Sequence, residues 1–93
     1  MTEYLISDGM SMGTVWMTCV RRPSGSLRRI KSKYLPLRES KDEAEQDLLF
    51  WLWERAFHDL APSHTERLRA MDSLNVYLGA HPEAKRWMFK PVE

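Results

Sequence analysis

Apolar and polar positions alternate along the first third of the chain and recur at helical spacing in the remainder. Tyr4–Ile6 is a short apolar run followed by an Asp-Gly pair, a pattern typical of a strand that ends at a turn. Residues 14–22 are rich in strand-forming side chains, and residues 27–35 alternate between apolar and polar. The Pro-Ser-Gly-Ser sequence at 23–26 predicts a hairpin between these two strands.

The length of this loop predicts which hairpin residues lie opposite one another. A four-residue loop pairs Arg22 with Leu27 and therefore directs Cys19 toward the core, next to Ile30. The core-facing pairs are then Val15 with Tyr34, Met17 with Ser32 and Cys19 with Ile30. The solvent-facing pairs are Val20 with Arg29, Thr18 with Lys31 and Trp16 with Lys33. One face is mostly apolar and the other is cationic, as a half-buried antiparallel pair requires.

Two capping boxes predict two helices in the second half of the chain, at Ser40–Glu43 and Ser63–Glu66. We expect the first helix to end near Leu60 and the second at Gly79, because glycine is typical of the position just after a helix. A short third helix is expected within Glu83–Phe89, before the chain ends. These elements predict an α+β fold: a three-stranded antiparallel β-meander followed by two α-helices, with room for a short third, packed on one face of the sheet.

The first helix contains an uninterrupted apolar run, Leu48–Trp53, which covers every side of a helix and so cannot be buried by one sheet alone. One stripe is expected to face the sheet and consists of Ala44, Leu48, Trp51, Leu52 and Ala56. A second stripe consists of Leu49, Trp53 and Phe57. Either the second helix and the C-terminal residues 87–89 cover it, or it contributes to a homodimer or partner interface. The residues of that alternative interface are Leu49, Trp53, Phe57, Trp87 and Phe89.

Length and composition indicate one domain, residues 1–93, because two domains would each be too small to bury a core. With 43% hydrophobic and 29% charged residues, the chain resembles an ordinary soluble globular protein. Charge is distributed unevenly. Residues 21–41 contain eight basic side chains and one acid, whereas the rest contain six basic and twelve acidic ones. The formal net charge of +1 therefore hides a strongly dipolar molecule, which favours an anionic partner.

The basic hairpin is the strongest indication of function, and nucleic acid is the partner that it favours. Cations neutralise phosphates, and an aromatic ring among them can stack on a base. DNA is favoured over RNA, because a two-stranded ribbon fits the major groove. The predicted binding residues are Arg21, Arg22, Arg28, Arg29, Lys31, Lys33 and Trp16. Three alternatives stay open: a solvated strand face, partial neutralisation by the acids that open the first helix, and an anionic protein surface.

A sheet followed by a capped helix resembles the plant ethylene-response-factor DNA-binding domain and the arm-binding domains of tyrosine integrases. The resemblance covers Val15–Leu48 and includes the basic hairpin, the Leu-Pro-Leu strand end at 35–37 and the Ser-Lys-Asp-Glu-Ala-Glu helix start at 40–45. It implies that the exposed face of the sheet enters the major groove. The longer, more aromatic first helix and the presence of a second helix depart from that pattern.

Other chemistry is sparse in this sequence. The histidines and Cys19 lack the spacing of a zinc site, and no phosphate-binding or dinucleotide fingerprint is present. We therefore expect no enzymatic activity, no catalytic residues, no metal and no cofactor. A single cysteine, no signal-peptide pattern and no long apolar segment favour a cytoplasmic protein without a membrane span.

Overall fold

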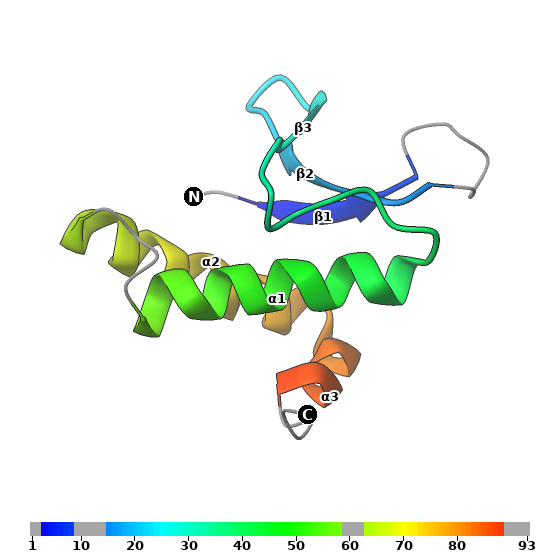
Figure 1. The fold of residues 1–93 in the computed structure, drawn as a ribbon. Coiled ribbons are helices and arrows are strands. Elements are labelled where there is room, and N and C mark those ends of the chain that lie inside the picture. Colours follow the sequence, from blue (N-terminus) through cyan, green and yellow to red (C-terminus); the bar gives the residue numbers. More distant parts are fainter. Residues whose placement is uncertain (1–2, 9–14, 59–62, 89–93) are drawn as a thin grey trace.

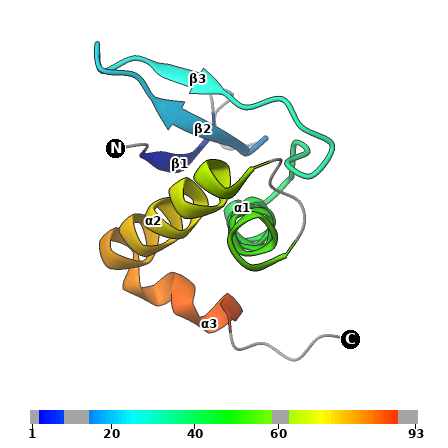
Figure 2. The same ribbon diagram turned by 90° about the vertical axis from the view of Figure 1, so that its left-hand side faces the viewer.

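The computed structural model describes residues 3–8, 15–58 and 63–88 and confirms the α+β class (Figure 1). In chain order the elements are β1 (Tyr4–Ser7), β2 (Met17–Arg21), β3 (Leu27–Arg29), α1 (Lys41–Phe57), α2 (His64–Ala80), the 3₁₀ turn η1 (Pro82–Ala84) and α3 (Lys85–Met88). The strands form one antiparallel sheet in the order β1-β2-β3. As predicted, both long helices lie on one side of this sheet, and β3 lies at the edge farthest from them (Figure 2).

The hairpin register differs by one residue from the predicted one. Arg21, not Arg22, lies opposite Leu27, and Cys19 lies opposite Arg29 rather than Ile30. The cause is a tighter loop than the sequence suggested. The amide of Gly25 donates to the carbonyl of Arg22 (2.8 Å), and the amide of Arg22 donates to the carbonyl of Ser26 (2.8 Å).

This loop depends on Gly25, whose φ of +90° is a conformation that other residues adopt only with strain. The turn at Pro23–Gly25 followed by Ser26 has the hydrogen bonds of a three-residue loop with a bulge. Because side chains alternate along a strand, a shift of one residue exchanges the two faces of β3 relative to β2. Relative to the helices, the residues of β2 differ from the prediction: Val20 lies on the helix side and Cys19 on the outer side, whereas Arg29 stays on the outer side.

The strand β3 is shorter than the predicted strand at 27–35 and ends at Arg29. A turn follows, in which the amide of Tyr34 donates to the hydroxyl of Ser32 (3.2 Å). The amide of Leu35 donates to the carbonyl of Ser32 (3.1 Å), and the Leu35 side chain is buried in the core. This turn brings the chain back, so that Trp16 pairs with Arg38. The predicted pairing of Trp16 with Lys33 is therefore wrong.

Both predicted helix starts are confirmed. The hydroxyl of Ser40 accepts from the amide of Glu43 (3.2 Å) and donates to its carboxylate (3.0 Å). The hydroxyl of Ser63 accepts from the amide of Glu66 (3.2 Å). These caps satisfy amides that have no partner inside the helix and fix where α1 and α2 begin.

The helix ends differ from prediction by a few residues. The helix α1 ends at Phe57, and the predicted end at Leu60 lies outside the described residues. The helix α2 continues past Gly79, because the amide of His81 still donates to the carbonyl of Tyr77 (2.8 Å). The predicted short third element is present as η1 and α3, whereas Phe89 lies outside the described residues.

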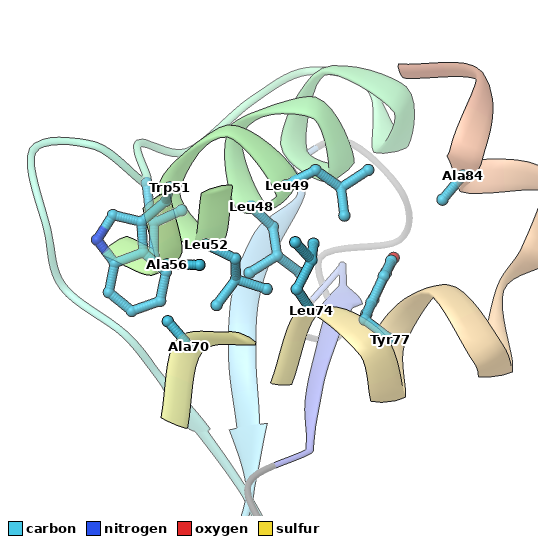
Figure 3. Packing of buried hydrophobic residues seen from close by; sticks show 10 residues of the cluster. Leu48, Leu49, Trp51, Leu52, Ala56, Ala70, Leu74, Tyr77 and Ala84 are labelled. Carbon is cyan, nitrogen blue, oxygen red and sulfur yellow. The ribbon is translucent and has the colours of Figure 1, made fainter. Parts of the chain in front are cut away.

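The core lies between the sheet, α1 and α2. Figure 3 shows Leu48, Leu52 and Ala56 of α1 directed toward Ala70 and Leu74 of α2. The predicted sheet-facing stripe of α1 is buried throughout. Its members are Ala44, Leu48, Trp51, Leu52 and Ala56. The helices thus bury most of the apolar area that stabilises the fold.

One buried carboxylate joins the three helices. Glu45 of α1 is only 4% exposed and accepts from the hydroxyl of Tyr77 (2.6 Å) and from the indole of Trp87 (2.9 Å). Tyr77 belongs to α2 and Trp87 to α3. Burial, followed by this hydrogen bond, strongly raises the pKa of Tyr77. The phenol therefore stays protonated and keeps donating to Glu45.

Candidate nucleic-acid interface

The register sorts the cations of the hairpin by face. Tyr4 of β1 contacts Trp51 of α1 edge-on, with 5.7 Å between ring centroids, so the face of Tyr4 is the helix side of the sheet. Val20 lies opposite Tyr4 and Arg28 lies opposite Val20, which places Arg28 on that same face. Arg29, opposite Cys19, lies on the face turned away from the helices.

The remaining cations extend this basic region in two directions. Arg21 shares the outer face with Arg29, and Arg22 begins the loop. Lys31 and Lys33 follow β3 and lie outside any strand. Five of the six cations are exposed, and Arg29 is half-buried. The structure therefore brings all six together on one hairpin and its continuation, but distributes them over both faces.

Most of these cations have no acidic neighbour. Arg21 lies 3.3 Å from a carboxylate oxygen of Glu3. For the other five, no carboxylate of the described residues lies within the 4.0 Å of an ion pair; they are Arg22, Arg28, Arg29, Lys31 and Lys33. The acids that open α1 bind other arginines instead: Asp47 holds Arg38, and Asp42 holds Arg86. Among the described residues, the acids that open α1 therefore form no ion pair with the hairpin cations, although they do pair with Arg38 of the same basic stretch.

Arg29 has an unusual environment. Its Nε atom is buried and has no hydrogen-bond partner among the described residues. The neighbouring Cys19 is 3% exposed, although the sequence analysis directed it to the opposite face. Burial raises the pKa of the Cys19 thiol, and the nearby Arg29 charge offsets part of that rise. A protonated, buried thiol is a poor nucleophile.

Trp16 does not accompany the cations as predicted. Its amide donates to the carbonyl of Arg38 (2.7 Å), and the amide of Arg38 donates back (2.9 Å). Alternation along the strand places Trp16 on the face of Thr18, opposite to that of Arg29. The hypothesis that Trp16 stacks on a base assumed that Trp16 lies beside Lys33 on the cationic face. The observed pairing with Arg38 does not place it there.

Tyr34 is the aromatic residue that the sequence analysis missed. The predicted register directed it into the core, yet it is 38% exposed in the structure. The ammonium of Lys33 lies 5.1 Å from its ring centroid. The signal that could have found it is the Ser-Lys-Tyr sequence at 32–34, in which the Ser32 hydroxyl competes with strand hydrogen bonds.

The alternative interface on α1 is only partly exposed. Leu49 is 1% exposed and belongs to the core, and Trp87 is half-buried against Glu45. Trp53 and Phe57 are 40% and 49% exposed, with ring centroids 4.5 Å apart. Phe50, which the sequence analysis did not include, is 59% exposed on the same side of the helix.

The described residues offer little for catalysis or metal binding. Ranges 3–8, 15–58 and 63–88 contain no group of three histidine, cysteine or acidic side chains placed to hold a metal ion. Glu54 and His58 are an isolated pair, 3.6 Å apart on α1. Arg38 binds Asp47 through two hydrogen bonds, of 2.7 and 3.1 Å, which commits that carboxylate to a structural role. Across these ranges, no helix has both the length and the apolar character that crossing a bilayer requires.

A small cavity of about 140 Å³ lies between β1, α1 and α2. Its polar lining includes Tyr4, Arg55, Glu66 and Arg69. Arg55 and Glu66 already bind each other at 2.7 Å. Burial raises the pKa of Tyr4, with smaller opposing effects of Arg55 and Glu66. The cavity is well below the 300–1,000 Å³ typical of sites for organic ligands.

Comparison with family models, with curated proteins and with solved structures found no match to this chain.

Proposed function

We propose that this protein binds nucleic acid through the basic hairpin formed by β2 and β3 and the segment that follows. The observation that supports this is a set of cations with no carboxylate of the described residues within ion-pair distance: Arg22, Arg28, Arg29, Lys31 and Lys33. A surface cation with no internal acid keeps its full attraction for phosphate, whereas a paired one must first lose its partner.

The arrangement of charge also favours binding over a merely solvated strand face. A solvated face would carry cations on one side of the sheet only. Here Arg28 and Arg29 extend from opposite faces of the edge strand, and Arg22 extends the charge to the loop. Cations around an entire ribbon present a target that phosphates can approach from several directions.

A salt titration tests the proposal. Fluorescence anisotropy with labelled DNA and RNA should show affinity that falls with salt, with a slope of log K against log salt of about −4 if four or five phosphates are contacted. The triple change Arg28→Glu, Arg29→Glu and Lys31→Glu should weaken binding at least about 100-fold at 0.1 M salt. Its matched control is Lys85→Glu, an exposed lysine of α3. Affinity that is independent of salt, or unchanged in the triple variant, would contradict the proposal.

A second candidate function is protein binding through α1. The exposed aromatic side chains of Phe50, Trp53 and Phe57 favour it, because such residues are enriched at interfaces. Light scattering after size exclusion should then show a wild-type dimer that becomes a monomer in Trp53→Glu. A wild-type monomer would exclude self-association as the use of this surface.

A further inference from the structure

The two arginines of β3 lie on opposite faces of the sheet, although they are neighbours in sequence. Arg28 lies opposite Val20 on the helix side, and Arg29 lies opposite Cys19 on the outer side. Arg21 shares the outer face with Arg29. A nucleic acid that lay flat on the outer face would meet Arg21 and Arg29 but not Arg28.

The helices pack mainly against β1 and β2 and leave β3 at the edge of the sheet. Figure 2 shows β3 at the edge of the sheet, with α1 and α2 packed near β1 and β2. Arg28 is exposed even though it is on the helix side. The free edge of the hairpin thus carries charge on two opposite faces, both accessible to solvent along β3.

The end of the hairpin is narrow. The three-residue loop contains only Pro23, Ser24 and Gly25, none of which has a bulky side chain. The guanidinium of Arg21 folds back toward the carbonyl of Gly25 (3.4 Å) and stays close to the ribbon. A narrow loop flanked by cations fits entry into a groove better than contact with a flat surface.

We propose that the β2–β3 ribbon enters the major groove of duplex DNA and contacts the phosphates on both sides of that groove. This inference rests on the proposed function and adds the class of nucleic acid. The major groove of B-form DNA is about 12 Å wide and admits a two-stranded ribbon. The major groove of an RNA duplex is too narrow for side chains to enter. A single strand, in turn, has no second backbone for the opposite face of the ribbon to contact.

The test compares the two neighbouring arginines. Anisotropy titrations would use a labelled DNA duplex of about 20 base pairs, one of its strands alone, and the RNA duplex of the same sequence. Arg28→Ala and Arg29→Ala should each weaken duplex DNA binding about fivefold to tenfold at 0.1 M salt and reduce the salt slope by about 1. Arg69→Ala, an exposed arginine of α2, should change neither. Arg21→Ala provides a second outer-face variant in case the half-buried Arg29 cannot be replaced without unfolding.

The outcomes separate a failure of groove entry from a failure of nucleic-acid binding itself. If Arg29→Ala or Arg21→Ala weakens binding and Arg28→Ala does not, the ligand lies flat on the outer face. Groove entry is then wrong, and nucleic-acid binding stands. Equal affinity for the single strand or for the RNA duplex overturns groove entry in the same way. An absence of salt-dependent binding to all three probes overturns both.

Discussion

The arginines of the hairpin and the arginines beside the helices carry the same side chain in opposite surroundings. Arg22, Arg28 and Arg29 have no carboxylate within ion-pair distance among the described residues. Beside the helices, four arginines lie within 4.0 Å of an acid; these are Arg38, Arg55, Arg69 and Arg86. The first group has no internal acid to hold it, and the second group is held by acids of the fold. Net charge alone, at +1, does not reveal this division.

The largest expected effect concerns the helices, where charge serves stability. Glu45→Ala should lower the free energy of unfolding by about 3 kcal/mol, because it leaves the Tyr77 hydroxyl and the Trp87 indole without their acceptor. Urea denaturation followed by circular dichroism would measure the change. Glu54→Ala, on the same helix but more exposed, should cost about 0.5 kcal/mol or less. Equal stability of the two variants would remove the structural role assigned to Glu45.

A smaller effect separates the two kinds of arginine directly. Arg38→Ala should cost about 1–2 kcal/mol of stability, because it breaks two hydrogen bonds to the mostly buried Asp47. Arg28→Ala should cost less than about 0.5 kcal/mol, since its side chain is exposed and unpaired. DNA affinity should fall more in Arg28→Ala than in Arg38→Ala. Thermal unfolding would measure the stability of both variants, and anisotropy would measure their DNA affinity. A variant that loses stability and affinity together would contradict the division into structural and ligand-binding arginines.

The smallest effect appears at alkaline pH. The pKa of Tyr77 is raised above its usual value of 10.0 by burial and by Glu45. The stability that this shift contributes is fully present below pH 10 and is lost as pH rises above it, because only the unfolded tyrosine ionises there. At pH 11 the loss is about 1 kcal/mol. Tyr77→Phe should remove this part of the pH dependence in urea titrations at pH 9 and 11, although Tyr4, whose pKa is also raised, will retain its own share. An unchanged pH dependence in Tyr77→Phe would contradict the assignment.

Local signals explain what the sequence predicted well. Ser40 and Ser63 open helices through hydrogen bonds to residues three positions away, so the information lies within a single turn. The α+β class follows from the change of apolar period along the chain. The sheet-facing stripe of α1 was predictable for the same reason, since its members share one side of a helix whatever the neighbouring elements are.

Register and exposure were not predictable from the same signals. The Pro-Ser-Gly-Ser sequence fits a four-residue loop and the observed loop equally well, and only the positive φ of Gly25 distinguishes them. That single residue changed the partners of Arg28 and Arg29 across the hairpin, and with them the faces assigned to Cys19 and Val20. The exposure of Trp53 depends on where α2 and α3 lie, which no pattern within α1 encodes. Long-range packing, and not local preference, determined which candidate site residues face solvent.

Arg38 gives the molecule a mechanical joint. Its backbone is paired with Trp16 at the base of the hairpin, while its guanidinium is bound to Asp47 in the middle of α1. This residue therefore adds a polar link between the two layers to the apolar core that joins them, at the end of the hairpin farthest from the loop. A load applied at the tip, such as the pull of a bound polymer, would act through this joint on α1. The orientation of the ribbon relative to the helices thus depends on Arg38 as well as on the apolar core, and a change in either layer would be felt by the other at this residue.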